Sequence, residues 1–312
     1  MLSADQIAQF HRDGFLALRG VFHGRELDLL RAAADQVVAE GVARRGEHHL
    51  YWPQPDGSTT YFRSERMWDR DPIFGAATVN PTLLAAIGQC YGHVFVPFND
   101  SFVCKIPQGN VPVPWHQDPP YGGPQGKRES CPLGNFDTDI YLDHSTIANG
   151  CVWGIPGHHL VGHVEYERFT QEQLFRDCGA VPLEMAPGDV LFHSISAPHG
   201  SIGNRTATMR RIFYVHYLPQ ATFDEDYGPS TWAKAKDPAR PEHVARVAGM
   251  LATRAALGFD GLAGSRVVWT GQGFAFDGAP TTPPYHWRTL SAALPADVKA
   301  QMRTLATVHR PC

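Results

Sequence analysis

The amino-acid sequence predicts a mainly β protein with flanking helices, whose centre is an antiparallel sandwich or barrel. Between residues 93 and 218, short β-rich runs alternate with Gly, Pro and Asn turns, and few helical segments lie between the runs. Helical periodicity is concentrated before and after this stretch. The β-rich runs are Val94–Pro97, Ser101–Ile106, Asp139–Leu142, Cys151–Ile155, Val181–Met185, Val190–His193 and Arg211–Leu218.

The first 92 residues are expected to be mostly helical. Ser3 followed by Gln6 fits a capping box, and residues 25–44 place apolar side chains three and four positions apart. Asn80-Pro81 is typical of the start of a further helix, which Gly92 is suited to end. Two more helices are expected near the C-terminus, over residues 242–257 and 295–308.

We expect a single domain over residues 1–312. The chain has 312 residues, 43% of them hydrophobic, which is enough for a sizeable core; length alone would also permit two domains. The expected organisation is a mostly helical part over 1–92, the β core over 93–218, and an irregular and helical cover over 219–312.

Composition argues against several classes of protein. The formal net charge is −4, whereas a nucleic-acid-binding protein normally has a strongly basic face. The six cysteines form no C-x-x-C pair, so neither a zinc ribbon nor a disulfide framework is indicated. The N-terminus lacks the pattern of a signal peptide, and no apolar run is long enough for a membrane helix. We expect a soluble, cytoplasmic protein; the oligomeric state is left open.

The tripeptide His116-Gln117-Asp118 carries the main chemical signal, together with His199. In an extended strand, residues two apart point to the same side, so His116 and Asp118 can offer a nitrogen and an oxygen to one ion. Two histidines and one carboxylate form the facial triad that binds iron(II) and leaves three coordination positions open. His193 is a competing ligand, but a hydrogen-bonded histidine of the core is the better interpretation.

Two further side chains are suited to bind an anion beside such a metal. Arg210 lies near the start of the run that follows His199, and a guanidinium matches a carboxylate in bidentate geometry. Ser201 adds a hydroxyl donor for the same group. Arg211 is expected to point to the opposite side, toward solvent or an acidic neighbour.

The set of motifs resembles the phytanoyl-CoA dioxygenase family of iron(II)/2-oxoglutarate oxygenases. The likeness extends over roughly residues 3 to 218, and the order and intervals of the motifs match. The motifs are Phe10–Phe15, Gly20–Phe22, Trp115–Asp118, Asn149–Cys151, Ile155–His159, Pro187–His193 and His199–Ser201, with Asn204 and Arg210.

This resemblance implies a double-stranded β-helix (jelly-roll or cupin-like) core. It also implies that His116, Asp118 and His199 bind Fe(II), and that Arg210 and Ser201 hold the distal carboxylate of 2-oxoglutarate. The reaction would consume O2, release succinate and CO2, and oxidise a small organic molecule. Halogenating relatives lack the carboxylate of the triad, so the presence of Asp118 favours hydroxylation or a related oxidation.

The substrate is not identified by these motifs, although a secondary metabolite is the preferred interpretation. The loop over residues 119–136 is expected to form one wall of the site, with Tyr121 near the metal. Asp139 and Tyr141 share one side of the next strand, and Trp153 is a further candidate substrate contact. The alternative roles are cross-strand packing for Tyr141, a surface carboxylate for Asp139 and packing in the core for Trp153.

Two other functions are compatible with the same residues. A cupin-like zinc or manganese isomerase or hydrolase would use the same three ligands but would have no need of Arg210. A non-catalytic β-sandwich binding module would leave the combination of the triad with Ser201 and Arg210 unexplained.

Overall fold

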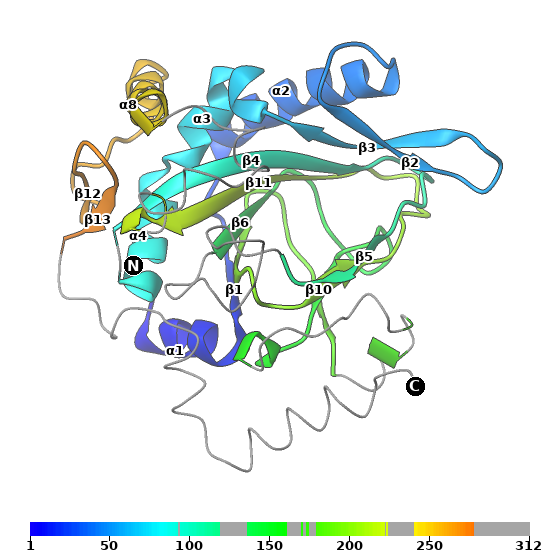
Figure 1. Cartoon of the computed structure of the whole chain (residues 1–312), viewed down its shortest axis with the longest axis horizontal. Coiled ribbons are helices and arrows are strands. Elements are labelled where there is room, and N and C mark those ends of the chain that lie inside the picture. Colours follow the sequence, from blue (N-terminus) through cyan, green and yellow to red (C-terminus); the bar gives the residue numbers. More distant parts are fainter. Residues whose placement is uncertain are drawn as a thin grey trace.

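Two antiparallel sheets face each other, and helices cover the outer side of the larger one (Figure 1). The computed structural model describes residues 1–92, 94–118, 136–160, 170, 173–174, 179–221, 223 and 240–277. These residues are the described part of the chain.

The larger sheet has nine strands in the described part of the chain. Its main order is β1-β9-β6-β11-β4-β13-β12, while β3 also pairs with β4, and β2 with β3. Its strands are β1 (Phe15–Leu18), β2 (His49–Pro53), β3 (Thr59–Glu65), β4 (Phe95–Lys105), β6 (Phe136–Tyr141), β9 (Val190–Ser194), β11 (Arg210–Pro219), β12 (Val267–Trp269) and β13 (Phe274–Phe276).

The smaller sheet has four described strands in the order β5-β10-β7-β8. These are β5 (Val113–His116), β7 (Val152–Gly154), β8 (Val181–Leu183) and β10 (His199–Ser201). Two facing antiparallel sheets in a chain of this order are the jelly-roll arrangement that the resemblance implied.

The described α-helices are α1 (Ala4–Asp13), α2 (Gly24–Val42), α3 (Pro72–Thr78), α4 (Pro81–Tyr91) and α8 (Arg240–Ala256). Four of these five form where the sequence predicted a helix, and α3, within the part expected to be mostly helical, was not predicted individually. Ser3 and Gln6 make the predicted capping box of α1. The side chain of Asn80 caps α4, which ends at Gly92 with a φ of 67°. The helix predicted over residues 295–308 lies outside the described residues.

Several elements differ from the predictions, among them β1, β12 and β13, which were not predicted as strands. The runs expected at 94–97 and 101–106 are one strand, β4, because the residues between them also pair with β11. The hairpin of β2 and β3 was not predicted and lies in the part expected to be mostly helical. Its aromatic and β-branched residues flank the turn at Asp56-Gly57, which is a strand signal that the helical interpretation overlooked.

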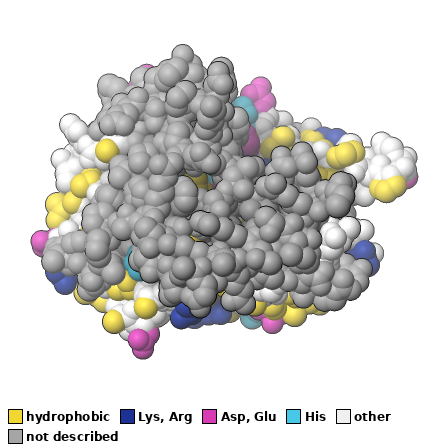
Figure 2. Space-filling view, turned by 60° about the horizontal axis from the view of Figure 1, so that its bottom comes forward, with side chains coloured by type: hydrophobic (Ala, Val, Ile, Leu, Met, Phe, Trp, Pro, Cys, Tyr) yellow, Lys and Arg dark blue, Asp and Glu magenta, His cyan; other side chains and the backbone are white. Residues whose placement is uncertain are grey.

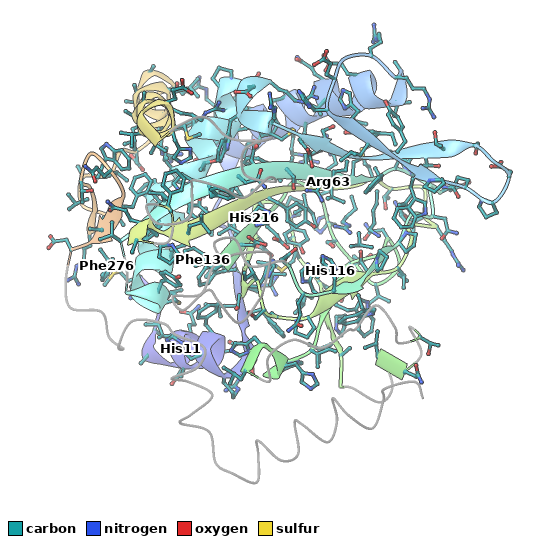
Figure 3. The ribbon with its side chains drawn as sticks, in the orientation of Figure 1. His11, Arg63, His116, Phe136, His216 and Phe276 are labelled. Atoms are coloured by element: carbon teal, nitrogen blue, oxygen red, sulfur yellow. The ribbon has the colours of Figure 1, made fainter. Side chains whose placement is uncertain are left out.

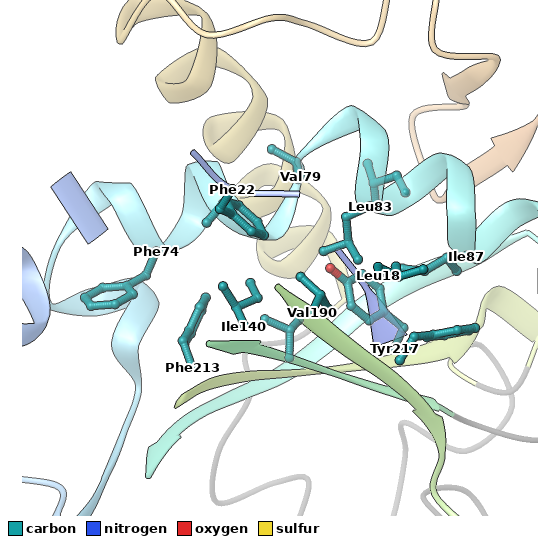
Figure 4. Close-up of a cluster of buried hydrophobic side chains, with 14 of the residues drawn as sticks. Leu18, Phe22, Phe74, Val79, Leu83, Ile87, Ile140, Val190, Phe213 and Tyr217 are labelled. Carbon is teal, nitrogen blue, oxygen red and sulfur yellow. The ribbon is translucent and has the colours of Figure 1, made fainter. Parts of the chain in front are cut away.

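The main core lies between the helices and the outer face of the larger sheet (Figure 4). Strand side chains such as Phe213 and Tyr217 pack there against Phe74 and Leu83 of the helices. The segment from Pro72 to Tyr91 is long and apolar enough to cross a membrane, but 94% of it is buried inside the protein, as expected for helices of a core.

Side chains of the larger sheet alternate between this core and the space between the sheets. On β6, Phe136 and Ile140 join the core, while Asp137 and Asp139 are buried on the other side. The outer face is therefore apolar and the inner face carries polar and charged groups.

A buried ion pair fastens α8 to the N-terminal helices. The Nη1 of Arg254 lies 2.5 Å from Oε1 of Glu26 on α2 and also donates to the carbonyl of Ala76 on α3 at 3.1 Å. The two charged side chains are 4% and 11% exposed.

We expect Arg254→Ala to lower the free energy of unfolding by about 3–5 kcal/mol, because it leaves the Glu26 carboxylate buried without its cation. Urea unfolding followed by circular dichroism measures this change. The matched control is Arg246→Ala on the same helix, whose more exposed pair with Asp69 contributes about 1 kcal/mol or less. Equal effects of the two substitutions would contradict the expectation.

Candidate metal and co-substrate site

Three short segments bring His116, Asp118 and His199 together. Strand β10 pairs with β5 so that His199 lies directly opposite His116. Asp118 follows two residues after His116, and its backbone N–H donates to the carbonyl of Ile195 at 2.9 Å. The three side chains offer ligand atoms that all lie within 4.8 Å of one another. The fold thus assembles the three residues that the sequence motifs singled out.

Backbone carbonyl groups orient both imidazole rings. The Nδ1 of His116 lies 2.7 Å from the carbonyl oxygen of Pro114, and that of His199 lies 3.1 Å from the carbonyl oxygen of Ala197. A carbonyl only accepts, so each Nδ1 carries the proton and each Nε2 is left with a lone pair. The Nε2 atoms lie 3.6 Å and 3.8 Å from the two carboxylate oxygens of Asp118.

The charges in this cluster suit a cation. Burial lowers the pKa of His199 to about 3, so this imidazole is neutral near neutral pH. Burial also opposes the charged form of His116, but the neighbouring Asp118 outweighs it and raises the pKa of His116. The pKa of Asp118 is held well below its usual range because the two histidines outweigh the cost of burial.

The donor set fits a divalent metal that accepts nitrogen and oxygen ligands. Two neutral imidazoles and one carboxylate form a facial set, and the ring centroids of the two histidines are 4.3 Å apart. Such a set suits iron(II) in the geometry of the non-haem oxygenases, and it leaves positions for other ligands.

Two buried basic side chains, Arg210 and Lys105, lie on neighbouring strands directly opposite each other. Arg210 is 0% exposed; its Nη2 donates to the carbonyl of Gly150 at 3.0 Å, while Nε and Nη1 have no hydrogen-bond partner in the described part of the chain. The Nζ of Lys105 donates to the carbonyls of Val111 and Ile202. Burial and the charge of Arg210 lower the pKa of Lys105 to about 6.

This pair of basic side chains is suited to bind an anion, because the described residues give neither side chain a carboxylate partner. Ser201 is 1% exposed and follows two residues after His199 on β10, so it shares the side of the strand that faces inward. Lys105 was not among the residues predicted from the sequence. The sign that could have pointed to it is a lysine at the end of β4, a strand whose residues are all buried, Lys105 included.

The expectations for the neighbouring residues are met by direct contacts. The Nε2 of His193 lies 3.2 Å from Oδ1 of Asp139, so His193 is the hydrogen-bonded histidine of the interior that was expected. Arg211 points to the other side of β11 and pairs with Asp143 and Asp35, as predicted.

The predicted substrate contacts have different positions. Asp139 and Tyr141 are buried on the inner side of β6, and the hydroxyl of Tyr141 has no hydrogen-bond partner among the described residues. Trp153 packs with Trp115 in a cluster on the outer side of the smaller sheet, opposite to the side of His116. In the described structure Trp153 has a packing role, and its contact with the substrate stays a prediction. Tyr121 lies outside the described residues.

Comparisons with known proteins agree with this arrangement. The model of the family described as phytanoyl-CoA dioxygenase (PhyH) matches residues 10–212. An ectoine dioxygenase from Bordetella parapertussis is 24% identical over 271 residues, which cover 78% of this chain and 82% of the relative. The dioxygenase lolE1 from Epichloe uncinata is 26% identical over 226 residues, covering 69% of this chain and 82% of the relative.

Solved structures support the same fold. EctD from S. alaskensis with bound Fe has a TM-score of 0.60 and 21% identity, covering 76% of this chain and 85% of its own. AviO1 from Streptomyces viridochromogenes Tue57 has a TM-score of 0.58 and 24% identity, covering 70% of this chain and 96% of its own. The predicted jelly-roll fold is thereby confirmed. Because the family match extends over most of the chain, the protein belongs to the phytanoyl-CoA dioxygenase family of iron(II)/2-oxoglutarate-dependent oxygenases.

Proposed function

We propose that this chain is an iron(II)/2-oxoglutarate dioxygenase that hydroxylates a small organic molecule, with His116, Asp118 and His199 as the iron ligands. The convergence of the three ligand atoms within 4.8 Å carries this proposal. The iron, when bound, supplies the activation of O2 that oxidises the substrate, while 2-oxoglutarate is converted to succinate and CO2. The protein binds and orients the reactants and limits access of water.

The distal carboxylate of 2-oxoglutarate would bind at Arg210, with Lys105 and Ser201 beside it. The Nε and Nη1 of Arg210, which have no partner among the described residues, offer two N–H groups to one carboxylate. A bound anion would remove the cost of the unpaired guanidinium and would favour the protonated form of Lys105 beside it. This need for an anion favours the oxygenase over a cupin-like enzyme of another class, which would not require Arg210.

Asp118 bears on the type of oxidation. A carboxylate in the triad occupies the position that a halide takes in halogenating relatives, so hydroxylation is favoured over halogenation. Succinate, CO2 and a hydroxylated product are the expected products.

The substrate is proposed to be a small molecule, as it is for the relatives named for ectoine. On the face shown in Figure 2, described charged side chains of both signs lie in separate small groups. That the protein binds neither nucleic acid nor a membrane stays a prediction from its composition and its net charge of −4. A cytoplasmic location and a role in secondary metabolism stay predictions.

The first test is an anaerobic titration of metal-free protein with iron(II) and then with 2-oxoglutarate. We expect a visible charge-transfer band from 2-oxoglutarate bound at the metal, and its loss in His116→Ala. Arg210→Ala should weaken 2-oxoglutarate binding about 30-fold or more, since removal of one partner of a buried charge pair costs about 2 kcal/mol or more.

The matched control for this titration is Arg211→Lys. Arg211 is adjacent in sequence but contacts Asp143 and Asp35 on the other side of β11, so its substitution should leave 2-oxoglutarate affinity nearly unchanged. If the wild-type protein binds iron but produces no band, the oxygenase proposal is wrong and the cupin-like enzyme becomes the better one.

Metal affinity should depend on pH through one ligand only. His116 has a raised pKa and must lose its proton to bind metal, whereas His199, with a pKa of about 3, is already neutral, and Asp118 is already ionised. Below the pKa of His116, we therefore expect the dissociation constant to rise about tenfold per pH unit, as for release of one proton. Cobalt(II) absorption titrations between pH 5.5 and 8 measure this dependence. A hundredfold change per unit, meaning two protons, would contradict the assignment of His199 as a neutral imidazole.

A further inference from the structure

We propose that the row of Asn99, Asp137, His193 and His216, on the inner face of the larger sheet, binds the substrate and selects a molecule that carries several hydroxyl groups. This inference rests on the proposed function and names the class of its substrate. These four residues are called the inner row.

The inner row crosses four neighbouring strands at one level. His193 on β9 lies opposite Asp137 on β6, Asp137 lies opposite His216 on β11, and His216 lies opposite Asn99 on β4. Residues that are directly opposite in adjacent strands point to the same side of a sheet. Since the other side packs against the helices, all four side chains point into the space between the two sheets. Figure 3 labels His216 of this row and His116 of the smaller sheet.

The inner row adjoins the metal ligands. Asp118, Asp137 and His193 offer ligand atoms within 4.8 Å of one another, and the rings of His193 and His199 are 5.0 Å apart. Arg210 lies six residues before His216 on β11, roughly 20 Å along the strand. The co-substrate is thus anchored toward one end of β11, and the inner row at the other end is left for the molecule that is oxidised.

The charged side chains on this inner face of the larger sheet are paired with one another. Asp137 contacts Nδ1 of His216, and Asp139, two residues along β6, contacts Nε2 of His193 at 3.2 Å. Free carboxylates would favour an ammonium group as the ligand. Carboxylates that already have a histidine beside them instead provide hydrogen-bonding capacity without a large net charge.

Asn99 and Asp139, on the same inner face, have one donor and one acceptor atom with unused hydrogen-bonding capacity. Neither Nδ2 of Asn99 nor Oδ2 of Asp139 has a hydrogen-bond partner in the described part of the chain, although the two residues are only 5% and 1% exposed. A buried polar group without a partner is costly in free energy, and a bound ligand that supplies the partner recovers this cost.

A hydroxyl group matches both atoms, because it accepts from an amide N–H and donates to a carboxylate oxygen. Asn99 and Asp139 lie on strands separated by β11, roughly 10 Å apart across the sheet. One molecule therefore reaches both only if it carries hydroxyl groups at separate positions, as a cyclic polyol or a sugar does. An aliphatic acyl chain would cover these groups without satisfying them, which is unfavourable.

The test is calorimetric titration of the anaerobic protein loaded with iron(II) and 2-oxoglutarate. The hydroxylated probes are myo-inositol, methyl α-glucopyranoside and sucrose, and the apolar probes are decanoate and decanoyl-CoA. The variants are Asn99→Ala, Asn99→Asp, which keeps the shape but removes the donor, and Asp139→Ala. The matched control is Asp143→Asn. Asp143 follows the end of β6, the strand of Asp139, but its carboxylate pairs with Arg211 on the outer side of the sheet.

We expect saturable binding of at least one hydroxylated probe. The variants Asn99→Ala, Asn99→Asp and Asp139→Ala should weaken this binding tenfold or more, whereas Asp143→Asn should change it less than twofold. The inference is overturned if decanoyl-CoA binds and no hydroxylated probe does, if no probe binds, or if the Asn99 and Asp139 variants bind the hydroxylated probe as wild type does. In those cases a normal charge-transfer band shows that the proposed function still stands, whereas absence of the band in wild-type protein means that the proposed function itself has failed.

Discussion

The pairing of β10 with β5, which sets His199 opposite His116, is the constraint on which the site depends. Side chains on opposite strands of a sheet are held about 5 Å apart, so the two imidazoles reach one point without help from a flexible loop. A shift of one residue in this register would turn His199 to the outer side of the smaller sheet and bring Gly200 inward. The same register requires a glycine at position 200, because a Cβ atom there would lie only 3.0 Å from the Trp115 side chain.

The larger sheet meets opposite demands on its two faces. Its outer face completes the main apolar core, whereas its inner face carries the arginine, lysine, aspartate and histidine side chains around the site. Burial of such groups is tolerable only where each has a partner or receives one from a ligand. Asp137 and Asp139 have histidines beside them, while Arg210 and Lys105 have none of the described carboxylates. The two aspartates are therefore satisfied by the protein itself, whereas Arg210 and Lys105 need an anion that a bound molecule supplies.

Much of this organisation could be predicted from sequence because strand and helix signals are local. The caps at Ser3 and Asn80 act within a few residues, and both were confirmed in position. The two-residue spacing of His116 and Asp118 is equally local, and the fold brings their ligand atoms close together. Contacts between distant segments were the difficulty. Whether Trp153 points toward the metal depends on which face of the smaller sheet it occupies, and its register with Gly200 cannot be read from neighbouring residues. The role of Lys105 in the anion site could not be predicted, because it depends on the pairing of β4 with β11 that places Arg210 opposite it.

The first strand has a consequence for the synthesis of the chain. Phe15 of β1 pairs with His193 of β9, so the partner strand leaves the ribosome about 180 residues later. At roughly 5–20 residues per second, the N-terminal segment waits about 10 to 35 s for that strand. During this time Phe10 lacks Phe192, the ring on which it stacks in the finished protein. The first helix to be made therefore carries an aromatic side chain that stays partly uncovered until a late strand arrives, and a chaperone can protect it in this interval.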